Sequence, residues 1–179
     1  MKLKGLQKRD EIMSDKNMTL DEIRELDKKY YMNTFGDRTP LCFTGGKGIE
    51  LTATDGKVYK DFFAGIAVNC LGYGHKRLTE ELCDQVSKLI HMSNIYYGES
   101  QAKLAETIVE NSCADRVFFC NSGAEANEGA IKLAKKYFVM RGHPEKREFI
   151  TLKNSFHGRT ITTAAATGQE KYRKPYSPL

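Results

Sequence analysis

One stretch of the chain decides its fold: RVFFCNSGAEANEGAIKLAKKYFVM, residues 116–140. It opens with a short, nearly continuous apolar run at 116–120, which is typical of a buried parallel strand. A small polar loop follows at 121–124, and the rest of the stretch has a helical pattern that Gly142 and Pro144 bring to an end. The sequence therefore predicts a strand, a loop and a helix in succession.

The next segment repeats this order. Residues 148–152 are expected to form a second strand, 153–159 a second loop, and Thr160 to Thr167 the start of another helix. Two such units in succession predict a right-handed parallel arrangement, with both loops at the same end of the sheet. Ligands of α/β proteins bind at that end. We therefore expect the two loops to lie side by side at a binding site.

The first half of the chain has a different organisation. A helix is expected to start at Thr19 with a capping box, and a hairpin is expected with its turn at Asp55-Gly56. The glycine-rich stretch 65–74 is typical of a loop or linker. Two further helices are expected to be capped by Thr79 and Ser100, with their apolar stripes buried.

Composition excludes several classes of protein. Hydrophobic residues at 40% and charged residues at 28% are globular values, and the net charge of +5 comes from cations that alternate with acids, so no nucleic acid is expected as a partner. The most apolar stretch, 62–71, has about half the length of the ~20 residues that a membrane-spanning helix needs, so no membrane span is expected. There is no secretory signal at the start and no Cys-x-x-Cys spacing among the five cysteines. These features predict a cytoplasmic protein with reduced, mostly buried thiols and no metal site.

The first loop has the residues of an anion site. Gly123 and Ala124 add almost no bulk at a helix N-terminus, where backbone N–H groups are unpaired, and Ser122 offers a hydroxyl. These three residues together suit a phosphate. The alternative is that Ser122 only caps the helix, and Glu125 complements the same helix dipole and would mildly oppose a phosphate.

The second loop adds an aromatic ring and a cation. Phe156 is suited to stack on a flat heteroaromatic ring, and Arg159 is suited to grip a carboxylate with two parallel hydrogen bonds. The alternatives are that Phe156 belongs to the core and that Arg159 caps a helix or forms a salt bridge. Beside the first loop, these residues describe a site for a phosphorylated aromatic cofactor and an amino acid.

Several segments carry a family resemblance. The stretches FFCNSGAEANE (118–128), NSFHGRT (154–160) and FAGIAVN (63–69), together with 32–38 and 93–97, resemble the class III (fold-type I) aminotransferases. The likeness runs from about Tyr31 to the end of the chain. Three separated motifs in the family's order make it very specific.

The resemblance implies an α/β fold of the fold-type I transferases that depend on pyridoxal 5'-phosphate, present here as an incomplete structure. Residues 1–30 would be an N-terminal extension and the first helix, and 31–75 the N-terminal small-domain segment and linker. Residues 76–179 would be the start of the large parallel-sheet domain that binds pyridoxal 5'-phosphate.

The resemblance also implies roles for the site residues. Gly123 and Ala124 would bind the cofactor phosphate through backbone N–H groups, with Ser122 as a helper. Phe156 would stack on the pyridine ring, and Arg159 would bind the α-carboxylate of the amino-acid substrate. No residue of the chain is expected to be catalytic, because the family's Schiff-base lysine and the acid that faces the pyridine nitrogen would lie beyond Leu179.

The implied activity is amino transfer between an amino acid and a 2-oxo acid in a homodimer, with residues 93–97 at the subunit interface. His157, where ornithine aminotransferases have Trp, favours the branch that uses N-acetylornithine and 2-oxoglutarate in arginine biosynthesis. Ornithine, succinylornithine and 4-aminobutyrate remain alternative donors. The chain alone is expected to be inactive, and a non-catalytic assembly module is the alternative from another class of protein.

Overall fold

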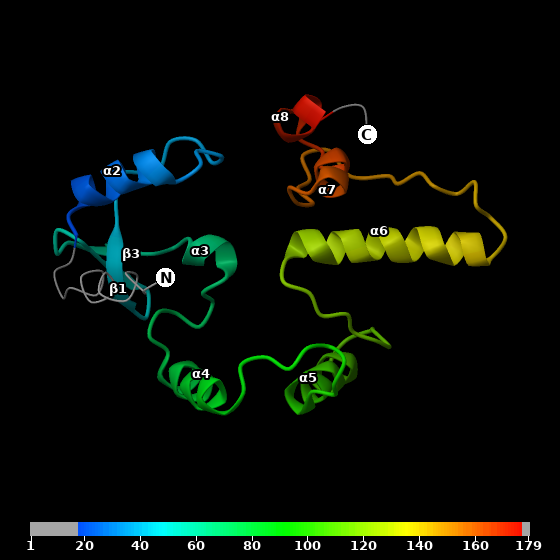
Figure 1. Ribbon diagram of the computed structural model, residues 1–179, viewed down its shortest axis with the longest axis horizontal. Helices are drawn as coiled ribbons and strands as arrows, with labels where there is room; N and C mark the ends of the chain where they lie inside the picture. The colour runs from blue at the N-terminus through cyan, green and yellow to red at the C-terminus, as the bar shows by residue number, and fades with distance from the viewer. Residues whose placement is uncertain (1–17, 177–179) are drawn as a thin grey trace, which may run out of the picture. The chain divides into compact units, whose positions relative to one another are not determined.

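The computed structural model describes residues 18–176, which form two compact units divided between Met92 and Ser93 (Figure 1). The helices of the first unit are α2 (Leu20–Tyr30), α3 (Ala64–Ala67) and α4 (Lys76–Lys88). Its strands are β1 (Phe43–Lys47), β2 (Glu50–Ala53) and β3 (Val58–Lys60). The second unit contains α5 (Glu99–Glu110), α6 (Gly123–Met140), α7 (Ile161–Ala166), α8 (Glu170–Arg173) and the 3₁₀ turn η1 (Lys174–Tyr176).

The capping box at the start of α2 is confirmed. The hydroxyl of Thr19 accepts a hydrogen bond from the backbone N–H of Glu22 at 3.3 Å, and the Glu22 carboxylate accepts one from the Thr19 N–H at 2.8 Å. The two bonds satisfy donors that would otherwise be unpaired at a helix N-terminus. The predicted extension before this helix lies outside the described residues, up to residue 17.

The predicted hairpin is confirmed as part of a three-stranded antiparallel sheet. β2 pairs with β3 across the Asp55-Gly56 turn, where the Asp55 carboxylate accepts a hydrogen bond from the N–H of Lys57 at 3.1 Å. β1 adds a strand that the sequence analysis did not predict, with its register shifted between Phe43 and Gly45. The order β1-β2-β3 follows the chain.

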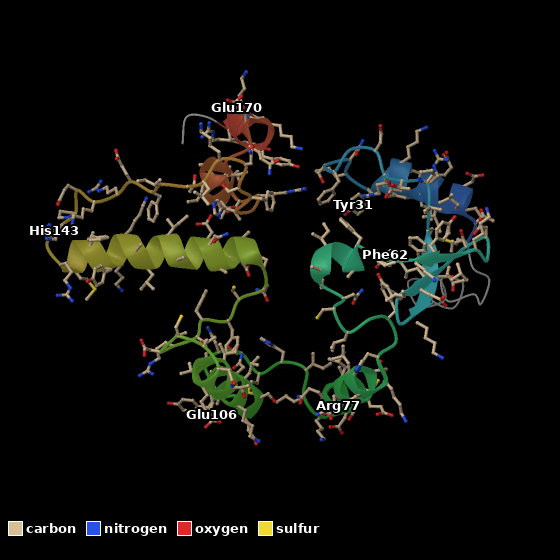
Figure 2. The ribbon with its side chains drawn as sticks, turned by 180° about the vertical axis from the view of Figure 1, so that it is seen from behind. Tyr31, Phe62, Arg77, Glu106, His143 and Glu170 are labelled. Atoms are coloured by element: carbon tan, nitrogen blue, oxygen red, sulfur yellow. The ribbon has the colours of Figure 1, made fainter. Side chains whose placement is uncertain are left out.

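The stretch predicted as a loop, 65–74, begins inside an unusual turn. All four residues of α3 have left-handed backbone angles, with φ of 47° at Ala64, 61° at Gly65, 64° at Ile66 and 62° at Ala67. Left-handed helical backbone costs an L-residue roughly 1–2 kcal/mol, and Ile66 is β-branched, which makes its conformation a clear outlier. Figure 2 labels Phe62, the exposed residue that leads into this turn.

Asp61 and Tyr73 hold this strained turn in place. The Asp61 carboxylate accepts hydrogen bonds from the N–H groups of Phe63 and Ala64 at 2.7 and 3.0 Å, and from the Tyr73 hydroxyl at 2.6 Å. Tyr73 is in turn joined to Gly48 by two backbone hydrogen bonds, of 2.9 and 2.8 Å. One carboxylate therefore connects the left-handed turn to the tip of the β1-β2 hairpin.

The starts of α4 and α5 differ from the sequence prediction. The cap of α4 is His75, whose ring nitrogen Nδ1 accepts the N–H of Leu78 at 3.2 Å, so the helix begins before Thr79. The Thr79 hydroxyl instead donates to the His75 carbonyl at 3.1 Å. α5 begins at Glu99 after Gly98, and Ser100 lies inside it. A ring nitrogen and a glycine replace the hydroxyl caps that the sequence suggested.

The second unit has the predicted helices without the predicted strands. α6 begins after Ser122 and ends at Met140, and α7 begins after Thr160, as expected. The stretches 116–120 and 148–152 do not form strands, and among the described residues the only sheet is the one in the first unit. The reason is physical: a strand exists through hydrogen bonds to a neighbour, and these two stretches do not pair with each other.

Burial is the largest departure from the sequence prediction. Within residues 18–176, the buried side chains are small ones: Ala53, Ala164, Thr163 and Thr167. The apolar stripe expected to be buried in and just after α4 is between 43% and 80% exposed at Leu82, Val86, Leu89 and Ile90. All five cysteines are free thiols, but four are exposed rather than buried: Cys70, Cys83, Cys113 and Cys120. No helix in the described part of the chain is long and apolar enough to cross a membrane.

The hydrogen bonds that Asp61 accepts at the left-handed turn lead to a prediction about pH. The Tyr73 hydroxyl, followed by the N–H of Phe63, holds the pKa of the Asp61 carboxyl below its ordinary value. A carboxyl with a lowered pKa stabilises the fold fully above its unfolded pKa of about 3.9, and this stabilisation is lost as the pH falls through the folded value. We expect the amide resonances of Phe63 and Ala64 to titrate with Asp61 below the ordinary range.

The Tyr73→Phe variant should move that titration upward toward the ordinary value, because it removes the largest cause of the shift. A matched control is Tyr59→Phe, which removes a hydroxyl from β3 that does not donate to Asp61. An NMR pH titration of all three proteins makes the comparison. Equal midpoints for Asp61 in the unmodified chain and in Tyr73→Phe would contradict the assignment.

Candidate active site

The first predicted loop forms the N-terminus of α6. Ser122 is the N-cap in extended conformation, and its hydroxyl oxygen accepts the N–H of Glu125 at 3.2 Å. Its carbonyl accepts the N–H of Ala126 at 3.0 Å. The capping alternative for Ser122 is therefore confirmed, but a hydroxyl that accepts one bond can still donate its own hydrogen to a ligand.

Glu125 has a partner of its own in the loop. Its carboxylate accepts the backbone N–H of Asn121 at 2.5 Å and the Asn121 side-chain amide at 3.4 Å. Together with the Ser122 bond, this makes a reciprocal pair of contacts across the start of the helix, similar to a capping box. The negative charge that was expected to oppose an anion is thus partly compensated by two donors from Asn121.

The amides of Gly123 and Ala124 are the donors that remain at this end. Within residues 18–176, no acceptor is bonded to either N–H group, as expected for the first turn of a helix. A Cβ placed on Gly123 would meet no atom within 4 Å, so the space over this residue is open. Two unbonded N–H groups, a hydroxyl and the positive end of an 18-residue helix have the chemistry that suits an anion.

The second loop lies directly against this helix end. Gly158 is buried, and a Cβ added to it would lie only 2.6 Å from the Cβ of Ala124 and 2.6 Å from the Thr163 hydroxyl oxygen. Its φ of +133° also falls where side chains are rarely found. Figure 1 shows α7, which follows this loop, beside the first turns of α6.

Two hydrogen bonds fix the second loop along α6. The side-chain amide of Asn127 donates to the His157 carbonyl at 2.7 Å, and the Thr160 hydroxyl donates to the Glu128 carboxylate at 2.6 Å. Neighbouring positions of α6 thus hold both ends of the loop segment 157–160. The two loops are brought together as predicted, through helix packing rather than through a parallel sheet.

Phe156 and Arg159 are both presented at the surface of the second unit. The Phe156 ring is 53% exposed, so it is not a core residue, and its one ring neighbour among the described residues is Tyr172, edge to face at 5.8 Å. The Arg159 guanidinium lies 5.8 Å from the centroid of that same Tyr172 ring. The sequence analysis did not single out Tyr172. An aromatic ring between two basic residues, Lys171 and Arg173, is a pattern that favours cation–π contacts.

His157 contributes to the site through its backbone. Its N–H donates to the Thr167 hydroxyl oxygen at 3.1 Å, and its carbonyl accepts the Asn127 amide. The ring nitrogen Nε2 is buried and has no hydrogen-bond partner in the described part of the chain. Through these backbone contacts His157 helps to hold the second loop against α6 and the Thr167 segment.

Residues 31–179 match the family described as "Aminotransferase class-III". The chain belongs to the class III aminotransferases. It is 53% identical over 151 residues to an acetylornithine aminotransferase of Synechocystis sp., a match that covers 84% of this chain and 35% of the relative. It is 51% identical over 155 residues to the acetylornithine aminotransferase of Methanocaldococcus jannaschii, covering 87% of this chain and 39% of the relative.

Solved structures of aminotransferases have a similar backbone. An ornithine aminotransferase from Toxoplasma gondii superposes with a TM-score of 0.83 at 26% identity, over 100% of this chain and 42% of its own. An aminotransferase from Bacillus anthracis superposes with a TM-score of 0.81 at 32% identity, over 91% and 38%. The incomplete α/β fold of fold-type I is therefore confirmed, and the chain spans well under half the length of these relatives.

Class III aminotransferases depend on pyridoxal phosphate, and the residues present are compatible with that cofactor. The open space over Gly123 and the unpaired N–H groups at the start of α6 suit a phosphate. An exposed aromatic ring in the adjoining loop, Phe156, suits a pyridine ring. The phosphate and the pyridine ring of the cofactor are thus each suited to one of the two loops, which meet at Gly158.

The contact at Gly158 generates a stability prediction. Gly158→Ala would place a methyl group within 2.6 Å of Ala124 and leave alanine at a left-handed φ, so we expect the second unit to lose about 1–3 kcal/mol of stability. Gly123→Ala is the matched control, because it adds the same methyl group where there is open space. Urea unfolding followed by circular dichroism compares the two variants.

Amide hydrogen exchange provides a second measurement on Gly158→Ala and Gly123→Ala, because it reports whether the second loop is docked. Exchange of the His157 amide should speed up in Gly158→Ala and stay slow in Gly123→Ala, since this N–H is bonded to Thr167 only while the loop is docked. Equal unfolding midpoints and equal exchange rates in the two variants would show that the close approach of Gly158 to Ala124 does not hold the loop.

Proposed function

We propose that this chain is the cofactor-binding front portion of an enzyme that moves the amino group of N-acetylornithine to 2-oxoglutarate in arginine biosynthesis. The observation that carries the proposal is the docking of the Phe156 and Arg159 loop on the N-terminus of α6, which joins an anion site to an aromatic and cationic surface. Identities of about half to acetylornithine aminotransferases support the choice of donor.

The first loop would hold the phosphate of pyridoxal 5'-phosphate. The N–H groups of Gly123 and Ala124 would donate to phosphate oxygens, and the Ser122 hydroxyl would add a third donor. The dipole of α6 favours an anion at this end by about 0.3–1 kcal/mol, and by up to ~2 kcal/mol where the site is partly buried. Because Ser122 and Glu125 already fix the first turn, these donors are oriented before the cofactor arrives.

The second loop would hold the pyridine ring and the substrate. Stacking of Phe156 on the ring would contribute about 0.5–1.5 kcal/mol beyond the area it buries. Arg159 would hold the α-carboxylate of the amino acid with two parallel charge-assisted hydrogen bonds, which fix its orientation. When bound, the cofactor supplies the electron sink for the amino-transfer chemistry.

We propose that the 179 residues alone do not turn over substrate. Amino transfer in this family needs a lysine that binds the cofactor covalently and moves a proton, and an acid that faces the pyridine nitrogen. Lys153 lies at the start of the second loop, but no described contact directs it toward the site. This chain would therefore supply binding and orientation, and the remaining length of the enzyme would supply the proton transfers.

The complete enzyme is proposed to be a cytoplasmic homodimer. The segment 93–97 would lie at the subunit interface, and its exposed apolar side chains, Ile95, Tyr96 and Tyr97, support that placement. The division into a small-domain segment at 31–75 and a large domain from residue 76 belongs to the same proposal. Five free thiols are compatible with a reducing compartment.

Ornithine is the second candidate donor. The likeness of the backbone to an ornithine aminotransferase supports it, and His157 in place of tryptophan argues against it. Assays of the complete enzyme with N-acetylornithine, ornithine, succinylornithine and 4-aminobutyrate separate the donors. A preference for any donor other than N-acetylornithine would overturn the proposed substrate.

Substitutions in the two loops should have separable effects in the complete enzyme. Arg159→Ala should raise the KM for the amino donor about ten- to a hundredfold, because hydrogen bonds to a charged group are lost, while the cofactor is retained. Gly123→Val should release the cofactor, because it fills the open space beside the anion site. Visible absorbance after dialysis measures the cofactor, and initial rates give the KM.

The control is Arg147→Ala, which removes an arginine of the same unit whose side chain donates to the Pro144 carbonyl, away from the two loops. It should leave the KM and the retained cofactor unchanged. If Arg159→Ala and Gly123→Val changed both quantities to the same extent, the roles of the two loops would have been assigned wrongly.

A further inference from the structure

One aromatic ring touches both of the groups assigned to the second loop. The Tyr172 ring lies edge to face with Phe156, with centroids 5.8 Å apart and an angle of 74° between the planes. The Arg159 guanidinium lies over the same ring at 5.8 Å, and the Lys171 ammonium lies over it at 4.7 Å. Edge-to-face rings and cations over a ring face are both attractive arrangements.

We propose that Tyr172 is a positioning residue that holds the ring of Phe156 and the guanidinium of Arg159 at a fixed separation. This inference rests on the proposed function, in which those two groups bind the cofactor ring and the substrate carboxylate. Arginine has a long side chain with many rotamers, and Phe156 is half exposed. A shared aromatic neighbour restricts both groups before any ligand binds.

The fold supports this role because the chain around Tyr172 is fastened to the second loop. The N–H of Gly168 donates to the carbonyl and the hydroxyl oxygen of Ser155 at 3.1 and 3.2 Å, and its carbonyl accepts the N–H of Asn154 at 3.4 Å. A Cβ on Gly168 would lie 2.3 Å from the Leu152 carbonyl oxygen, so only glycine allows this approach.

Thr167 provides a second connection between the segment that leads to Tyr172 and the second loop. It is fully buried, and its hydroxyl donates to the Thr163 carbonyl at 2.9 Å while accepting the N–H of His157 at 3.1 Å. α8, which begins at the labelled Glu170 in Figure 2, packs beside α7. Tyr172 is therefore carried on a segment that is joined to both sides of Phe156, and this accounts for its place against the loop.

The test uses two substitutions in the complete enzyme loaded with pyridoxal phosphate. Tyr172→Leu removes the ring and keeps apolar bulk, and we expect the KM for N-acetylornithine and the dissociation constant for 2-oxoglutarate to rise about two- to fivefold. Tyr172→Phe keeps the ring and should restore both values. Tyr176→Leu is the control, since it removes an exposed tyrosine of the same segment that contacts neither Phe156 nor Arg159 among the described residues.

A spectroscopic readout tests the geometry without reference to activity. The guanidinium Nε–H proton of Arg159 should show an upfield ring-current shift that is lost in Tyr172→Leu and kept in Tyr172→Phe. Loss of this shift together with unchanged binding of 2-oxoglutarate would overturn the positioning role, and so would a shift that survives in Tyr172→Leu. If Tyr172→Leu does not fold, Tyr172→Met provides the same comparison.

The two proposals fail in different ways. If the unmodified enzyme transferred no amino group from any donor, the proposed function would be wrong, and the affinities for 2-oxoglutarate would still decide the role of Tyr172. If the unmodified enzyme were active and Tyr172→Leu had the same KM and the same affinity for 2-oxoglutarate, the role of Tyr172 would be wrong and the proposed function would stand.

Discussion

The second unit depends on the close approach of Gly158 to Ala124 at the first turn of α6. The absence of a side chain at one position and a single methyl group at the other let the loop backbone lie against the helix. The hydrogen bonds from Asn127 to His157 and from Thr160 to Glu128 join the loop to α6 beside this contact, and each contributes about 1 kcal/mol net. Two small residues thus set the distance between the N-terminus of α6 and the loop that carries Phe156.

A polar core supports this approach where large apolar side chains are not buried. Thr163 and Thr167 are completely buried, and their hydroxyl groups bond to Thr160, to the Thr163 carbonyl and to the His157 amide. A buried hydroxyl without a partner would cost about 1–3 kcal/mol, so the network tolerates few alternative arrangements. The loop is therefore held by directional bonds more than by apolar packing.

The features that the sequence predicted correctly are those whose causes are local. Thr19, Ser122 and Thr160 each cap a helix through a bond to a residue three positions away, and the Asp55-Gly56 hairpin closes over a similar distance. The strands expected at 116–120 and 148–152 and the buried helix stripes need partners from elsewhere in the chain, and those predictions failed. The left-handed turn at α3 depends on a hydrogen bond between Asp61 and Tyr73, twelve positions apart, which no local pattern reveals.

In the candidate site, too, some residues are positioned by local structure and others by contacts with distant parts of the chain. The proposed anion site needs only a glycine, a small neighbour and a helix start, so residues 122–124 could be proposed from sequence, and their own helix organises them. Phe156 and Arg159 could be proposed from their side-chain chemistry, but their placement comes from Gly158, from Thr167 and from the ring of Tyr172. A change that loosens the second loop would leave the end of α6 intact. The two halves of the site therefore differ in how they are built, one by helix formation and the other by tertiary packing.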